Sequence, residues 1–209
     1  MDYGNFEEVK GPHKTAIKLL DTARELHQGR PLDQITVDDV INASGISRSS
    51  LYHHYEDFPH LLEHVLAAEF AEATKSTIAV IRKALETSSS REEFRLAMSA
   101  INETTQTPER ASARMQRIVA FATTDRNARF RVVLGEEQQR LTNDYASIIA
   151  QAQAKGWADP SLDPEAIAIF IQAFTIGRIV DDVAKDPIAP DRWIDFTMMI
   201  LDRVLFTSP

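Results

Sequence analysis

The 209-residue sequence predicts an all-α fold of about nine helices, with an N-terminal three-helix helix-turn-helix head before a larger helical body. Apolar residues repeat at the three- and four-residue spacing of one helix face through most of the chain. Helix-capping residues precede most of these runs, and only seven glycines are present. No convincing strand and no repeat of fixed period interrupts this pattern.

The first two predicted helices are short and clearly bounded. An apolar stripe predicts a helix over residues 14–28, which Gly29 ends. Thr36 is a good N-cap, and Asp39 stands at the capping-box position. A second helix is therefore expected over residues 36–43.

A tight turn leads to the third helix. Residues 44–46 read Ser-Gly-Ile, and glycine can take the left-handed conformation that ends a helix. Ser47 then caps a helix over residues 47–54, and Leu51 is spaced to pack it onto its predecessor. Two short helices joined in this way are typical of a helix-turn-helix motif.

Six further helices complete the prediction. Most begin at a capping residue or an early proline and stop at a glycine or a Ser/Thr cluster. Asp181 and Asp182 are assigned to the solvated surface of the body. The predicted ranges are 57–85, 90–104, 107–123, 130–155, 163–184 and 190–206.

Composition excludes several classes of protein. Cysteine is absent, which rules out disulfide scaffolds and thiol catalysis. The net charge is −8, and residues 1–64 hold six Lys/Arg against eleven Asp/Glu, which argues against indiscriminate nucleic-acid binding.

The longest uncharged apolar run, residues 166–177, is too short to cross a bilayer. Because the start also lacks the features of a signal peptide, a cytoplasmic protein without membrane contact is expected.

The third helix carries the most informative side chains. It presents Arg48, Ser49, Tyr52 and His53 outward, and each can reach phosphates or base edges in a major groove. The free amides at its start, near Ser47, can also hold a phosphate.

At this motif the chain resembles a known family. Residues 35–40 (ITVDDV) and 44–55 (SGISRSSLYHHY) are similar to the DNA-binding domain of TetR-family (tetracycline-repressor-like) regulators. The likeness covers roughly residues 13–66 and implies a DNA-binding domain at residues 1–57 and a dimerisation and ligand-binding domain at residues 58–209. Phe58 departs from the family pattern, which commonly has a phosphate-contacting lysine there. The DNA-binding residues expected from the motif and the resemblance are Thr36, Ser47, Arg48, Ser49, Ser50, Tyr52 and His53.

The last two predicted helices are apolar on two faces. A helix that is apolar nearly all round is buried on more than one side. Either the body has a thick core, or these helices pair with a second copy, as such regulators do; we favour the dimer. The expected interface residues are Phe170, Phe174, Trp193, Phe196 and Ile200.

The body is rich in aromatic residues and methionine, which predicts an apolar effector cavity. An arginine beside apolar walls can hold an acidic group, although pairing with surface carboxylates is the plainer interpretation. The candidate effector residues are Phe94, Met98, Arg114, Met115, Arg117, Phe121, Tyr145, Phe174 and Arg178.

No catalytic motif, cofactor fingerprint or metal site is predicted. His60 and His64 are one helical turn apart, but Leu61 stands where a metalloprotease motif has its glutamate. The sequence therefore predicts a homodimeric, sequence-specific DNA-binding transcriptional regulator. Its expected partners are a palindromic double-stranded DNA operator, a second copy and an unidentified small molecule.

A repressor released by a small, largely apolar effector is the favoured form of this regulator. Repressor and activator are not separated by the sequence. The alternatives are an all-helical enzyme with an assembled Asp/His/Arg site, and a regulator controlled by a protein partner.

Overall fold

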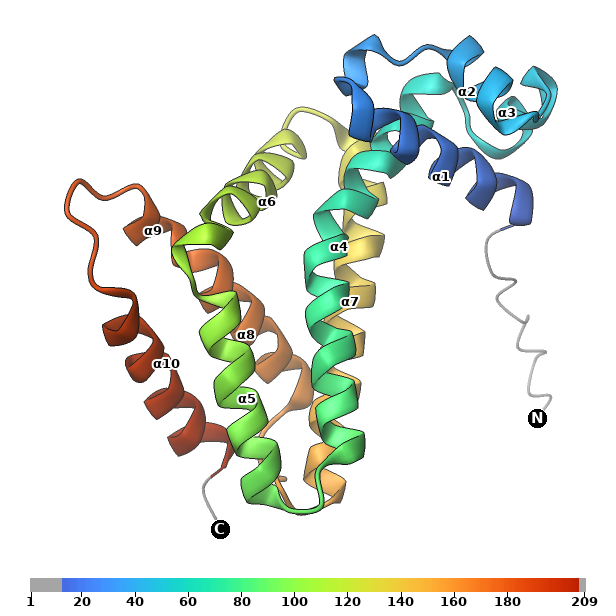
Figure 1. Ribbon diagram of the computed structural model, residues 1–209. Coiled ribbons are helices and arrows are strands. Elements are labelled where there is room, and N and C mark those ends of the chain that lie inside the picture. Colours follow the sequence, from blue (N-terminus) through green and yellow to red (C-terminus); the bar gives the residue numbers. More distant parts are fainter. Residues whose placement is uncertain (1–12, 207–209) are drawn as a thin grey trace, which may run out of the picture. The chain divides into compact units, whose positions relative to one another are not determined.

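The computed structural model describes residues 13–206, which form ten α-helices and two short 3-10 helices without a strand (Figure 1). This confirms the all-α prediction. Within α4 the chain divides into two compact units, an N-terminal unit up to residue 66 and a C-terminal unit from residue 67. The functional boundary expected at residue 57 stays a prediction.

In chain order the helices are α1 (Lys14–Gly29), η1 (Leu32–Gln34), α2 (Val37–Ser44), α3 (Arg48–His54), α4 (Phe58–Thr87), α5 (Arg91–Thr105), η2 (Pro108–Arg110), α6 (Ala111–Thr123), α7 (Ala128–Ala154), α8 (Pro164–Gly177), α9 (Ile179–Asp182) and α10 (Pro190–Leu205).

The N-terminal unit has its own apolar core. One fully buried side chain from each of its four helices meets there: Leu19, Val40, Leu51 and Leu61. Phe58 packs against this core as well, so this departure from the family pattern has a packing role. Burial of such side chains is the main driving force for packing short helices together.

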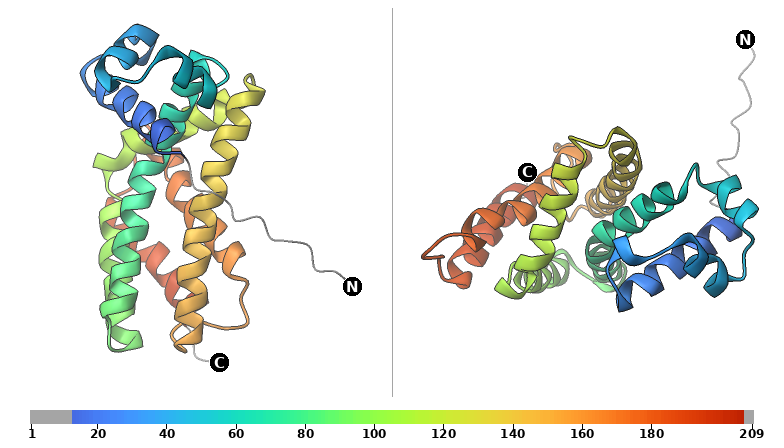
Figure 2. Two further views of the ribbon diagram at one scale, coloured as in Figure 1. Left: turned by 90° about the vertical axis from the view of Figure 1, so that its right-hand side faces the viewer. Right: turned by 90° about the horizontal axis from the view of Figure 1, so that it is seen from above.

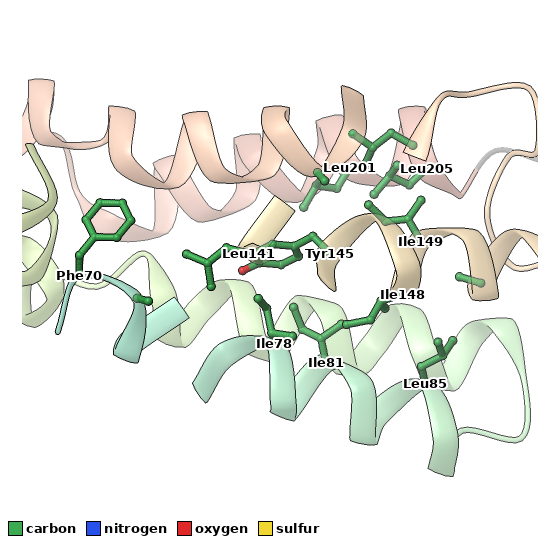
Figure 3. Packing of buried hydrophobic residues seen from close by; sticks show 14 of the residues in the cluster. Phe70, Ile78, Ile81, Leu85, Leu141, Tyr145, Ile148, Ile149, Leu201 and Leu205 are labelled. Atoms are coloured by element: carbon green, nitrogen blue, oxygen red, sulfur yellow. The ribbon is translucent and has the colours of Figure 1, made fainter. Parts of the chain in front are cut away.

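The C-terminal unit packs several long helices around a larger core. Figures 1 and 2 show α7 alongside α4, and an ion pair between Arg82 and Asp144 (3.2 Å) links the two helices. Asn102 of α5 donates a hydrogen bond to Thr197 of α10 (2.9 Å). Figure 3 shows that Tyr145 lies in the middle of the buried cluster.

Two details of the predicted helices are wrong. The helix expected over residues 163–184 is divided, since α8 ends at Gly177 and α9 begins at Ile179. The N–H of Asp181 bonds to the carbonyl of Arg178, three residues back (2.9 Å), which tightens the chain there. The helix expected from residue 107 begins with the 3-10 turn η2 before α6.

The assignment of Asp182 to the solvated surface is also wrong. Its side chain is 6% exposed and pairs with Arg114 of α6 at 2.6 Å.

None of the helices between residues 13 and 206 combines the length and the apolar character that crossing a bilayer requires.

Candidate functional site

The helix-turn-helix begins with a complete capping box. The side chain of Thr36 accepts a hydrogen bond from the N–H of Asp39 (3.3 Å), and the Asp39 carboxylate accepts one from the N–H of Thr36 (2.8 Å). The side chain and backbone of Thr36 lower the pKa of Asp39, and the Arg30 cation, 2.6 Å away, adds to this effect. Asp39 therefore stays ionised at neutral pH and holds the start of α2.

The turn between α2 and α3 depends on Gly45. Its φ of 68° lies in the left-handed region, and its N–H donates to the carbonyl of Ile41 (2.9 Å). A side chain at this position would strain the backbone. Ser47 then caps α3 by accepting a hydrogen bond from the N–H of Ser50 (3.2 Å).

Helix α3 has one buried and one exposed face. Leu51 is 0% exposed, and the hydroxyl of Tyr55 donates to the carbonyl of Ala16 (3.0 Å), which ties the end of α3 to α1. Tyr52, on the other face, is 44% exposed. All the residues predicted to bind DNA lie at the starts of α2 and α3 or along α3, and all but the half-buried Ser50 are exposed: Thr36, Ser47, Arg48, Ser49, Tyr52 and His53.

A cavity of about 90 Å³ lies within the C-terminal unit, between α4, α5, α6, α7 and α8. Five of the predicted effector residues line it, namely Met98, Arg114, Arg117, Tyr145 and Phe174. Its exposed surface is mostly apolar, which is typical of small-molecule sites, although about half of its lining residues have a polar side chain.

The other four predicted effector residues lie elsewhere. Phe94 lines a second cavity of about 30 Å³. Met115 is exposed, and Phe121 packs edge-to-face on Phe70 with their ring centres 5.0 Å apart. Arg178 is buried near Asp182.

Sequence reasoning missed several polar residues in the cavity wall. Thr74, Asn102 and Gln172 are buried and line it. A polar residue inside the apolar stripe of a helix, such as Thr74 one turn before Ile78, is the signal that can reveal such positions.

A buried ion cluster borders the cavity through Arg114. Both Asp182 carboxylate oxygens accept from Arg114, at 2.6 and 2.7 Å. Arg114 also donates to the carbonyls of Thr105 and Thr107. The guanidinium of Arg178 lies 3.7 Å from the same carboxylate. The cluster joins α6 to α9 and to the end of α8, and the Arg114 guanidinium donates four hydrogen bonds.

Comparison with protein families decides the assignment of the N-terminal unit. Residues 19–65 match the model of bacterial regulatory proteins of the tetR family, and this segment contains α2, the turn and α3. The N-terminal unit therefore carries a DNA-binding domain of the TetR type. The chain is a DNA-binding transcriptional regulator, and the helical enzyme considered from the sequence is set aside. Comparison with curated proteins gave no match.

Solved structures share the TetR fold over nearly the whole chain. A Mesorhizobium loti protein classed as a TetR-family transcriptional regulator is 13% identical, with a TM-score of 0.60 and coverage of 93% of this chain and 98% of its own. One from Rhodococcus sp. is 22% identical, with a TM-score of 0.56 and coverage of 91% and 98%. A Saccharomonospora viridis protein classed as a transcriptional regulator, in complex with choline, is 15% identical, with a TM-score of 0.52 and coverage of 93% and 98%. At these identities the likeness establishes a shared fold only.

The candidate DNA-binding face contains an internal ion pair. Arg48 at the start of α3 lies 2.5 Å from Asp38 of α2, and both side chains are largely exposed. An exposed pair adds little to stability. The pair does place the negative charge of Asp38 beside Arg48, a cation that can contact a DNA phosphate.

We expect Asp38→Asn to strengthen DNA binding about threefold to tenfold at low salt, because it frees Arg48 and removes a repelling charge. Fluorescence anisotropy with duplex DNA at two salt concentrations measures this. Asp33→Asn, at an exposed position in η1, is the control with the same change in net charge. Equal gains in the two variants would contradict a specific role for the Arg48 pair.

The residues predicted to form a dimer differ in their environments. Phe170 of α8 is 44% exposed and Phe196 of α10 is 50% exposed. Phe174, Trp193 and Ile200 are half-buried, and the indole N–H of Trp193 donates to Gln106 (2.8 Å). Further apolar side chains are exposed on the same two helices, among them Ile169, Met199 and Val204.

His60 and His64 form a hydrogen-bonded pair. Their Nε2 atoms are 3.2 Å apart, and Nδ1 of His60 accepts from the N–H of Glu56 (3.2 Å). With Nδ1 as an acceptor, the proton of neutral His60 sits on Nε2 and points to His64. Across residues 13–206, no three His, Cys, Asp or Glu side chains gather with the geometry of a metal site.

Proposed function

We propose that the protein is a homodimeric repressor that reads a palindromic operator with α3 and is released by a small, largely apolar effector. The observation that carries the DNA-reading part is the exposed polar face of α3. Arg48, Ser49, Tyr52 and His53 project from a helix whose opposite face, at Leu51, is fixed in the core. A recognition helix must present its side chains in this way to reach base edges.

Specificity in this proposal comes from base contacts more than from charge. Residues 1–64 carry a net charge of −5, from six Lys/Arg and eleven Asp/Glu. Non-specific affinity rises with the number of phosphates neutralised, so it is expected to be weak here. Base-edge contacts discriminate sequence independently of that charge.

The homodimer is supported by the apolar side chains that α8 and α10 expose in the single chain. Phe170 and Phe196 are large, and each leaves about half of its surface in water. Burying such aromatic surface against a second copy is favourable, and two-fold pairing is the commonest arrangement of soluble oligomers.

Effector control is supported by the cavity in the C-terminal unit. A regulator governed only by a protein partner has no need of such a cavity. The choline complex of the Saccharomonospora viridis protein supports small-molecule binding by this fold, although choline is the ligand of that protein. The proposal places the protein in the cytoplasm, where operator DNA is found.

Selection of bound duplexes from a random library tests the proposal most directly. We expect a palindromic consensus whose half-sites lie about one helical turn apart, because each subunit of a dimer reads one half-site. Tyr52→Ala and His53→Ala should each weaken binding to that duplex about tenfold, since one good base contact contributes about 1–3 kcal/mol. A consensus without symmetry would contradict the dimer, and unchanged binding by both variants would contradict the role of α3.

A further inference from the structure

Arg117 is a cation in the cavity wall that has no acidic partner in the described part of the chain. Its guanidinium donates to Thr74 and weakly to Gln138 (3.5 Å), both neutral, and lies 4.4 Å from the centre of the Phe70 ring. Its Nε is buried and has no hydrogen-bond partner in the described part of the chain. Between residues 13 and 206 no carboxylate lies within ion-pair distance of it.

The other two arginines of this wall are stabilised without a ligand. Arg114 makes two hydrogen bonds to the Asp182 carboxylate. Arg110 is exposed, so water solvates its charge. Arg117 is therefore the arginine of the cavity wall whose charge is neither paired with an acid nor well hydrated.

Arg117 nevertheless remains charged at neutral pH. Burial lowers its pKa to about 10, which is still well above 7. Burial raises the pKa of Tyr145 to about 12, so this phenol in the same wall stays protonated and can donate a hydrogen bond. A buried charge without a counterion is unfavourable, and a bound anion relieves that cost.

The second cavity extends the site in an apolar direction. It shares four wall residues with the first, Ile81, Met98, Tyr145 and Ile171. Apart from Tyr145, its walls are apolar. Figure 3 shows Phe70 at one end of the buried cluster, with Ile149 and Leu205 beyond Tyr145 at the other. Met98 lines both cavities, and a methionine side chain is flexible enough to adapt to a ligand.

We infer that the effector is a monocarboxylate with an apolar tail, whose carboxylate binds Arg117 and whose tail extends past Met98 into the second cavity. One guanidinium neutralises one negative charge, and its planar pair of donors matches a carboxylate. The inference rests on the proposed function in one respect, namely that the cavity binds the effector.

Matched acids and amides test this inference. The probes are the straight-chain carboxylates from butanoate to decanoate and benzoate, each compared with its neutral primary amide. Calorimetry measures their binding to the unchanged protein, to Arg117→Met and to the control Arg126→Met, which changes an exposed arginine outside both cavities. Release of the selected operator duplex and the melting temperature are measured in parallel.

We expect the best carboxylate to bind the unchanged protein and Arg126→Met about tenfold to a hundredfold tighter than its amide, which is the range for a charged hydrogen-bonded pair. In Arg117→Met this preference should vanish. Without a ligand, Arg117→Met should melt at the same temperature or higher, because an uncompensated charge has been removed. If this variant does not fold, Arg117→Lys replaces it and should weaken carboxylate binding at least about threefold, since lysine lacks the paired donors.

Equal binding of acid and amide, a preserved preference in Arg117→Met, or no binding by any carboxylate of the series would overturn the inference. These failures are separate from failure of the proposed function. If amides and acids bind equally and both release the operator, the effector cavity stands and the carboxylate does not. If the ligand-free protein binds no palindromic duplex, the proposed function itself fails.

Discussion

Phe196→Glu and Phe170→Glu are each expected to convert a dimer into a folded monomer and to weaken operator binding about 10²- to 10⁴-fold. The loss follows because two linked half-site contacts become independent ones. Both phenylalanines are about half exposed in the single chain, so a glutamate there leaves the fold of one subunit intact. It would place an unpaired charge in an apolar interface. Sedimentation velocity and operator titration measure the two effects.

The choice of position decides how clearly this experiment can be interpreted. Trp193 is hydrogen-bonded to Gln106, and Phe174 lines the cavity, so changes at either disturb the single subunit as well. Val80→Glu is the control, because Val80 is an exposed apolar residue of α4 in the same unit. Dimers that persist in both phenylalanine variants would show that α8 and α10 do not form the interface.

Asp182→Asn is expected to destabilise the C-terminal unit by about 3–5 kcal/mol, because it leaves a buried cation without its counterion. The side chains of Arg114 and Asp182 are only 4% and 6% exposed, so water cannot replace the lost charge. For a chain of this size the melting temperature should fall by about 10 °C. Thermal and urea unfolding followed by circular dichroism measure it.

Two further variants separate the ion pair from other effects. Asp38→Asn breaks the exposed pair with Arg48 and should change stability by less than about 1 kcal/mol. The triple variant Arg114→Met, Arg178→Met and Asp182→Leu removes all three buried charges of the cluster and should recover much of the loss, since apolar residues often replace buried ion pairs at little cost. If Asp182→Asn is no more destabilising than Asp38→Asn, the pair is effectively solvated.

Sequence patterns located the helix-turn-helix well because its signals are local. A capping box depends on two residues three apart, Thr36 and Asp39, and the turn depends on the left-handed conformation open to Gly45. The alternating burial along α3 follows from helical periodicity alone. All these interactions form within a few residues of chain, so they can be recognised without knowing the fold.

The cavity was harder to predict because its walls come from five helices. The sequence named Met98, Arg117 and Tyr145 among the effector candidates, and all three line this cavity, but it ranked three arginines alike. These arginines differ in the side chains that they contact. Asp182 lies 68 residues from Arg114 in sequence, so no local pattern shows that the two side chains meet.

The sequence by itself determined the all-α class, most helix limits and the residues exposed on α3, because these depend on interactions over three or four residues. Only the tertiary structure decided that α8 and α9 separate and that Asp182 is buried. It also decided that Arg117 lines the cavity without an acidic partner among residues 13–206. The physical reason is that burial and charge compensation depend on which distant helices pack together. Local propensity does not contain that information.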